Sequence, residues 1–465
     1  MGIGRLFDIS VRSMAAYQQA LDVTSNNISN ASNPAYTRQK VLLASETAEN
    51  GKGVGVKVQD VIRIKNDLLG VQISKYQSML SDADKRSAIL SQVETIVSEP
   101  STNGLANYFT EFFNSWDQLS TNPNSIPLRL NVIQKAQGVA DRFKQILEGL
   151  NDVQKTLQDN ATTTIDQINN DLKELYGYNS KITESTLRGI SASELKDQRD
   201  ALVAKLSESV NLSYRINDTG AAIVTIGGVQ AADQYGYNQF EVKIVNGKMQ
   251  MVSTDDTQAA AVINSGELFA ITDLYSNKIP QYKSSFENLQ NTFVNKVNEL
   301  HRGGNSLVQG GTSATNIPFF GELSIDGSVS GAISDGLIKI NASILSDPRN
   351  ISASDVANND GDGGTANKIA RLFDSTFGEL NGQTFMDYYS SNLNAMGMEK
   401  VSSANAVESN GAILQELKNE NSSYSAVSLD EEMTNVLKYQ RSYDAASKMV
   451  KVADEMMQTV LNMVS

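Results

Sequence analysis

Apolar side chains recur every seven residues near the start of the chain. One series is Phe7, Met14, Leu21 and Ile28, and a second is Ile3, Ser10, Tyr17 and Thr24. Two positions repeated at this interval form a narrow stripe along one side of an α-helix, which is the pattern of a coiled coil. The pattern stops near Asn30. Because Pro34 disfavours the α conformation in the residue before it, we predict a turn there.

The carboxyl-terminal end carries a longer version of the same pattern. Its first series is Leu429, Val436, Tyr443, Val450, Met457 and Val464, and its second is Tyr439, Ala446, Ala453 and Val460. A single helix of about 35 residues would span roughly 50 Å. A seam this narrow is stable only against a partner helix. The two ends therefore form either a coiled-coil hairpin inside one subunit or helices that await neighbouring subunits.

Two further helices are predicted between the ends. The first has heptad positions over residues 69–97 and ends at Pro100. The second begins near Ser125, loosens at Ala161–Thr164 and resumes at Ile168. Together these segments predict an elongated helical rod.

Near Leu212 the spacing of apolar residues changes from the helical repeat to every second residue, which is the repeat of a β-strand. Asn246-Gly247 separates two alternating runs, which is a strong signal for a β-hairpin. We therefore expect a small β domain inserted into helical sequence. A second, Gly-rich stretch after residue 303 is also expected to contain strands.

The predicted fold class is mainly α with inserted β, comprising an axial coiled-coil domain, an elongated helical rod and a small outer β domain. The expected bounds are 1–60 and 405–465 for the terminal axial domain, 61–206, 266–302 and 346–404 for the rod, 207–265 for the β domain, and 303–345 for the Gly-rich segment.

Composition narrows the possible functions. There are 53 acidic and 39 basic residues, a formal net charge of −14, so the surface repels nucleic-acid phosphates and anionic lipids. No apolar run reaches 18 residues, and no cleavable signal or lipid anchor is expected at the start. The chain lacks cysteine, and His301 is its one histidine. We therefore expect no catalytic residues, no cofactor, no metal and no enzymatic activity.

Two motifs suggest ligands but depart from the patterns that ligands need. Residues 358–364 resemble the opening of a calcium loop, yet Ile369 stands where a bidentate Glu is required, so a polar turn before a helix is the simpler interpretation. Gly51–Gly55 lacks the GK[ST] ending of a phosphate loop and is better explained as a turn entering a strand.

The stretch Ala20–Gln39 resembles the amino-terminal signature of the flagellar rod, hook and hook-associated protein family. Its ending, Tyr-Thr-Arg-Gln at residues 36–39, is similar to the hook-associated branch, whose first member joins hook to filament. Asn33 and Ala35 depart from the usual residues, and Ala resists the positive φ that the usual Gly allows. The stretch from Leu429 to Met456 is similar to the family's closing signature.

Three internal stretches carry the resemblance through most of the chain. They are Gly104–Arg129, Asp197–Asp200 and Val297–His301. The inserted β domain shows no match. Outer domains of this family are typically the variable part.

The resemblance implies a structural role outside the cell. Such proteins leave through the flagellar type III export channel, bound at their carboxyl end by an export chaperone, and form a ring on the hook. The implied partners are the hook protein, the next hook-associated junction protein and identical subunits. The expected assembly interface is the pair of first series: Phe7, Met14, Leu21, Ile28, Leu429, Val436, Tyr443, Val450, Met457 and Val464.

Other functions remain open at this point. Another axial protein of the family, from the hook or the distal rod, is the nearest alternative, and a flagellin is a more distant one. A surface adhesin would place its activity in residues 207–265, where carbohydrate binding would support it. An export-linked hydrolase would need a catalytic constellation.

Overall fold

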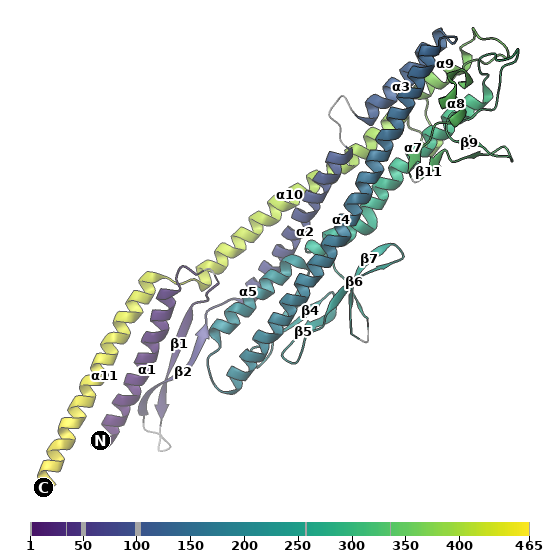
Figure 1. The fold of residues 1–465 in the computed structure, drawn as a ribbon. Helices are drawn as coiled ribbons and strands as arrows, with labels where there is room; N and C mark the ends of the chain where they lie inside the picture. Colours follow the sequence, from purple (N-terminus) through teal and green to yellow (C-terminus); the bar gives the residue numbers. More distant parts are fainter. Residues whose placement is uncertain are drawn as a thin grey trace.

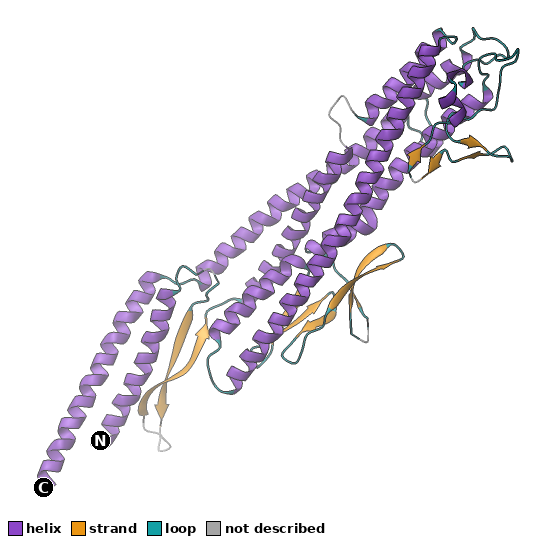
Figure 2. Ribbon diagram, in the orientation of Figure 1, coloured by secondary structure: helices purple, strands orange, loops and turns teal. Residues whose placement is uncertain are grey.

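The computed structural model describes residues 2–33, 35–47, 53–97, 104–255, 258–334 and 336–464 and has the shape of a long, narrow rod (Figure 1). Both chain ends lie at the same end of the molecule. Helices run along its length, and small β sheets lie on one side in this view (Figure 2). The mainly α class with inserted β structure is confirmed.

Four elements form what we call the axial unit. They are α1 (Ile3–Ser29), β1 (Gln39–Thr47), β2 (Gly53–Arg63) and α11 (Leu429–Val464). The two strands pair as an antiparallel ribbon, and α1 packs against both this ribbon and α11. Arg5 donates to the Gly53 carbonyl over 3.0 Å, and Arg12 donates to Glu46 over 2.8 Å. These bonds fasten the ribbon to the helix.

The second body is the helical rod. Its elements are α2 (Asp67–Val97), α3 (Leu105–Thr121), α4 (Ile126–Leu187), α5 (Ser193–Ser209), α6 (Glu267–Asp273), the π-helical turn η1 (Leu274–Lys278), α7 (Ile279–Gly303) and α10 (Phe385–Ser425). Helices α2 and α10 lie side by side, and α3 packs on α4. The rod is thus a bundle of helices of unequal length.

Helix α4 runs unbroken for 62 residues, which at 1.5 Å per residue is about 90 Å. The Ser125 hydroxyl accepts a hydrogen bond from the Leu128 amide and caps its start, as predicted. The predicted loosening at Ala161–Thr164 is wrong. Ala161 and Thr164 are buried in the helix, and this tertiary packing outweighs the low helix propensity of threonine.

An aromatic core fills the distal end of the rod. Its fully buried rings are Phe109, Phe112, Phe293, Phe319 and Phe385. The Phe293 ring lies 5.2 Å from both Phe109 and Phe112 in edge-to-face contact, a favourable arrangement for aromatic pairs. Because these residues come from α3, α7, α10 and a distal loop, one cluster holds four segments together.

The inserted β part consists of two three-stranded antiparallel sheets. The first contains β3 (Leu212–Ile216), β4 (Ala222–Ile226) and β5 (Val229–Ala232), and the second contains β6 (Phe240–Val245), β7 (Lys248–Ser253) and β8 (Ala260–Ala261). The predicted hairpin is confirmed, with φ values of 53° at Asn246 and 75° at Gly247. The Val262 amide donates to the Gly227 carbonyl and joins the two sheets.

The distal segment is mostly loop. Its short elements are β9 (Glu322–Leu323), β10 (Val329–Ser330), β11 (Ile333–Ser334), β12 (Leu337–Ile338), α8 (Ala342–Ser346), η2 (Pro348–Asn350), α9 (Gly364–Ala370), η3 (Arg371–Asp374) and η4 (Gly378–Leu380). The Gly-rich stretch therefore contains strands, as predicted, but each is only two residues long.

One domain boundary differs from the prediction. The expected start of the axial part at residue 405 falls inside α10, which continues to Ser425. Lys418 still bonds to Gln77 of α2 over 3.2 Å, so this stretch belongs to the rod. The chain leaves the rod only at Ala426–Ser428. The predicted helix end at Pro100 lies outside the described residues.

Within the ranges given above, no helix is both long and apolar enough to cross a bilayer. The same ranges bring together no group of three or more His, Asp or Glu side chains suited to hold a metal ion.

Candidate assembly interface and its junction with the rod

The axial helices α1 and α11 run antiparallel and pack along each other within one chain (Figure 1). The rings of Tyr17 and Tyr439 stack with centroids 6.5 Å apart. Apart from Asn27, the buried positions of α1 are small: Ser10, Ala16, Ala20 and Thr24, none more than 4% exposed. Small side chains allow close approach of a neighbouring element.

The predicted interface residues of α1 lie beside this buried line. Phe7 is 38% exposed, and Met14, Leu21 and Ile28 are partly buried. The large side chains of the series are thus only partly covered by the rest of the chain.

On α11 the predicted positions fall into two groups. Val436, Tyr443 and Val450 are partly buried, on the side of the helix that also buries Ala446 and Ala453. Leu429 is 52% and Met457 38% exposed. The side chain of Val464 lies outside the described residues. The expectation that the two terminal helices lack a packing partner within a single subunit is wrong, because α1 and α11 partly cover each other.

A second apolar stripe on α11 was not predicted, although one of its members, Val460, stands in the second heptad series. It consists of Met449, Val452, Met456, Val460 and Met463, which are 44–80% exposed. Their spacing of three or four residues places them on one side of the helix. Helix α11 also extends past the start of α1 (Figure 1). An exposed apolar stripe of this kind marks a surface for another protein.

Asn27 closes the loop between α1 and the ribbon. Its amide nitrogen donates to the Gln39 carbonyl over 2.8 Å, and its Oδ1 accepts from the Gln39 amide over 3.0 Å. The Tyr36 hydroxyl donates to the same oxygen over 2.8 Å. Asn27 is 1% exposed, so its side chain replaces the hydrogen bonds that water would give these groups.

The two departures from the family signature are accommodated in this loop. The Asn33 Oδ1 accepts from the Ala35 amide over 3.1 Å, an Asx turn that threonine would form less readily. The amide of Ala35 is thereby held by the side chain of Asn33. The turn here therefore works without the glycine that the signature usually carries.

Arg38 ties this loop to the start of α11. Its guanidinium donates to Glu432 over 2.7 Å and to Glu431 over 2.9 Å. The bond from Arg38 lowers the pKa of Glu431 below its ordinary value. Glu432 is only 2% exposed, so the arginine charge compensates a buried carboxylate.

Arg63, at the end of β2, connects the axial unit to the rod. Its Nη2 lies 2.6 Å from a carboxylate oxygen of Asp197 and 2.6 Å from one of Asp200, both on α5. Burial raises the pKa of Asp197, although the charge of Arg63 opposes it. Burial would also raise the pKa of Asp200, but the charges of Arg199 and Arg63 outweigh it and the pKa is lowered.

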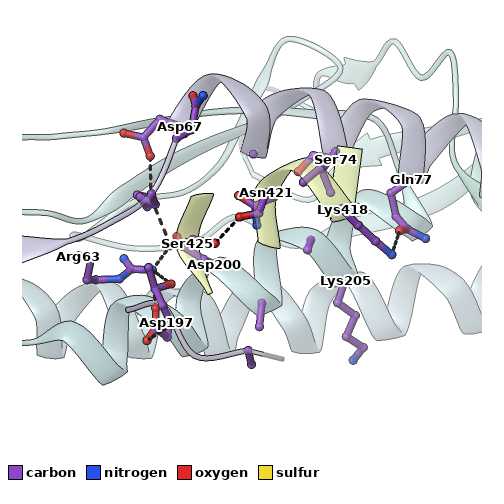
Figure 3. Close-up of a pocket in the computed structure, with 18 of the residues that line it drawn as sticks. Arg63, Asp67, Ser74, Gln77, Asp197, Asp200, Lys205, Lys418, Asn421 and Ser425 are labelled. Carbon is purple, nitrogen blue, oxygen red and sulfur yellow. Dashed lines mark hydrogen bonds and ion pairs between the residues drawn. The ribbon is translucent and has the colours of Figure 1, made fainter. Parts of the chain in front are cut away.

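Cavities flank this cluster on two sides. One, of 460 Å³, is lined by Thr37 from the axial side and by rod residues that include Ser74, Asp200 and Asn421 (Figure 3). The other, of 270 Å³, lies between the end of β2 and the start of α5. Arg63 lines both cavities.

His301 is buried in the distal core and has a structural role. Its Nδ1 donates to the Ile317 carbonyl over 2.7 Å, and its Nε2 accepts from the Ser352 amide over 2.8 Å. Burial lowers the pKa of His301 to about 4. The neutral ring, with both nitrogens engaged, is not available as a general base.

The two candidate ligand loops have other roles. In the calcium-like loop, Asp362 accepts hydrogen bonds from the amides of Asp355 and Gly364, and Asp360 accepts from the Val308 amide. These carboxylates stabilise loop backbone. Gly51 and Lys52 of the phosphate-like loop lie outside the described residues, and β2 begins at Gly53.

Three regions of the chain match known families. Residues 90–320 match "Flagellar hook-associated protein FlgK helical domain", residues 419–463 match "Flagellar basal body rod FlgEFG protein C-terminal", and residues 7–37 match "Flagella basal body rod protein". Two curated relatives, both named "Flagellar hook-associated protein 1", align over nearly the whole chain. The one from Bacillus subtilis is 29% identical over 97% of this chain and 96% of its own. The one from Escherichia coli is 22% identical over 98% and 99%. The chain thus resembles flagellar hook-associated protein 1 over nearly its whole length.

A solved structure has the same fold. The flagellar hook junction protein FlgK from Burkholderia pseudomallei superposes with a TM-score of 0.63 at 13% identity, covering 76% of this chain and 100% of that one.

The junction gathers residues from all three family-matched regions. Asn27 and Tyr36 lie in the first, Asp197 and Asp200 in the second, and Glu432 in the third. Signature segments far apart in the sequence thus meet at one place in the fold. Asn27, Tyr36 and Glu432 hold the loop between α1 and β1 inside the axial unit, and Asp197 and Asp200 bind that unit to the rod through Arg63.

Proposed function

We propose that this chain is a structural subunit of the bacterial flagellum that joins the hook to the filament, assembled as a ring at the distal end of the hook. The observation that carries the proposal is the exposed apolar stripe of α11 beside the α1–α11 pair. Single exposed apolar residues are ordinary, but five on one side of a helix need a partner. Resemblance to flagellar hook-associated protein 1 indicates which assembly supplies it.

The proposed partners follow from the position of this surface. Identical subunits cover the stripe laterally, the hook protein meets the ring on one side, and the next hook-associated junction protein meets it on the other. Contacts of this kind join different patches of neighbouring subunits, which gives rings or helical stacks rather than closed dimers. The nearest alternative is another axial protein, of the hook or distal rod.

Before assembly the same stripe needs protection from water. We propose that an export chaperone binds the carboxyl-terminal part of α11, which extends past α1 and is exposed on all sides. The chain then leaves the cell through the flagellar export channel. This role is structural and requires no catalytic residue, cofactor or metal.

Deletion of the gene followed by electron microscopy tests the proposal. We expect hooks without filaments and filament protein shed into the medium. Normal filaments in the deletion strain would refute the junction role.

Complementation of that strain with single variants tests the stripe itself. Met456→Asp places a carboxylate in the stripe at a side chain that is 47% exposed. We expect the melting temperature of the purified chain to stay within about 2 °C, because the site is not part of its own core, and attachment to hooks to be lost. The matched control is Gln458→Asp, which adds the same charge on the opposite side of α11 and should restore filaments. If both variants lose attachment to hooks equally, the added charge prevents attachment whatever its position, and the stripe is not the assembly surface.

A further inference from the structure

The axial unit and the rod share little packed surface. Helices and strands of the axial unit pack mainly on one another, and the two bodies lie end to end (Figure 1). The chain passes between them twice, at residues 64–66 and at residues 426–428, and neither segment belongs to a helix or a strand. Two linkers of three residues each leave the angle between the bodies to be fixed by other contacts.

Two backbone amides of the axial unit bond to the rod, Thr37 to the Asp197 carboxylate and Arg38 to the Ser425 carbonyl, and the ion pairs of Arg63 join them. The side chain of Arg63 is 7% exposed and that of Asp197 is 8% exposed, so this ion pair is shielded from water. The same guanidinium nitrogen also lies within 2.6 Å of Asp200 and donates to the Thr37 hydroxyl over 3.2 Å. One side chain of the axial unit thus holds two carboxylates of the rod.

A single side chain can govern the angle because the surrounding junction is not tightly packed. The cavities of 460 and 270 Å³ separate the bodies on both sides of Arg63. Side chains that border an unfilled space have no packing partner on that side and offer little resistance to rotation. In Figure 3 the labelled side chains of Arg63, Asp197 and Asp200 gather at one end of the larger cavity.

We propose that Arg63 holds the axial unit and the rod in one orientation, because its ion pairs with Asp197 and Asp200 fix the angle between them. When these ion pairs are lost, the axial unit rotates relative to the rod about a hinge at residues 64–66 and 426–428. Without the guanidinium, Asp197 loses its ion-pair partner in a nearly buried place, whereas Asp200 keeps Arg199 and Lys65. An uncompensated carboxylate at that depth favours a movement of the bodies that exposes it to water. The motion widens the cavities and leaves each body intact. This inference concerns the single chain and stands apart from the proposed function.

Distance measurements between two spin labels test the hinge. The chain has no cysteine, so pairs of cysteines can be introduced without removing native thiols. One pair, at the exposed positions Asp22 on α1 and Lys173 on α4, reports the distance between the bodies. A second pair, at Asp22 and Lys448 on α11, reports the axial unit alone.

We expect Arg63→Gln to broaden and shift the distance distribution of the first pair and to leave the second pair unchanged. Arg86→Gln is the matched control, because Arg86 also bridges two carboxylates, Asp82 and Asp273, but lies entirely within the rod. It should leave both distributions as in the wild type. Unchanged distances in Arg63→Gln would overturn the proposal.

Arg63→Lys keeps the test decisive if the glutamine variant does not fold. Lysine retains the charge, but it carries a single ammonium nitrogen on a shorter side chain and lacks the planar guanidinium. We expect a smaller broadening of the distribution between the bodies than in Arg63→Gln. If the lysine variant gives the wild-type distribution, the bridging of two carboxylates does not set the angle, and the proposal fails.

Discussion

Asn27 offers a direct test of how the axial unit is held together. Replacing it with alanine removes three hydrogen bonds, two to the Gln39 backbone and one from the Tyr36 hydroxyl. The hydroxyl of Tyr36 is partly exposed and can bond to water instead. The Gln39 amide and carbonyl have no such substitute where Asn27 is buried.

The magnitude follows from these two backbone groups. Leaving a buried donor or acceptor unpaired costs about 1–3 kcal/mol, so we expect Asn27→Ala to lose about 2–6 kcal/mol of stability in the axial unit. A water molecule entering the vacated space brings the loss toward the lower value.

Hydrogen exchange of the full chain measures this loss where it occurs. Exchange across residues 36–41 should become faster by the factor that corresponds to the lost free energy, tenfold for each 1.4 kcal/mol, whereas exchange in α4 should not change. Asn26→Ala is the control, because the Asn26 side chain bonds to Asn30 at the end of the same helix and is partly exposed. If both variants accelerate exchange equally, the hydrogen bonds between Asn27 and the Gln39 backbone do not stabilise the axial unit.

Two further predictions concern the stability of the protein at low pH and the packing of α11 against α1. The folded-state pKa of His301, about 4, lies below the ordinary 6.5, so the unfolded chain binds the proton more readily. The contribution of His301 to the free energy of unfolding is therefore fully present above pH 6.5. It is lost as the pH drops toward 4, and the loss amounts to about 3 kcal/mol. Denaturant unfolding of the wild type and His301→Gln between pH 4 and 7 checks this, and equal slopes against pH would contradict it. Val450→Asp places a carboxylate in the partly buried seam between α11 and α1, and should destabilise the axial unit by about 1–3 kcal/mol while Lys448→Asp does not. Hydrogen exchange in α1 distinguishes the two variants, and unchanged exchange in Val450→Asp would show that the seam is not packed in the single chain.

The heptad series predicted both axial helices, because large apolar residues dominate any periodic signal. The same emphasis hid some of the most buried positions. Ala16 and Ala20 belong to neither series, yet they are 4% and 0% exposed. Burial of a small residue depends on what approaches it, and the sequence pattern does not contain that information.

Helix ends were predicted where a residue type enforces them and missed where only tertiary contacts decide. Ser125 caps α4 as predicted, because its hydroxyl satisfies a free amide. The break at Ala426–Ser428 has neither proline nor glycine. The Arg38 amide donates to the Ser425 carbonyl there, a contact between distant parts of the chain that local propensity cannot reveal.

The junction was predicted only in part. Resemblance singled out Asp197–Asp200 and the segment around Asn27, but no spacing in the sequence relates either of them to Arg63. Their proximity arises because β2 ends beside α5, which depends on the whole fold. Burial and ion pairing at Asp197 therefore became visible only in the structure.

The antiparallel pairing of α1 with α11 also sets the order in which the chain folds. Tyr17 and Tyr439 touch across nearly the whole length of the sequence. Contacts of such separation form late, because closing so long a loop costs entropy that only the finished contact offsets. On the ribosome α1 emerges first and has no α11 to meet until synthesis ends. The segment made first therefore waits longest for its partner, and the two ends of the chain become ordered together.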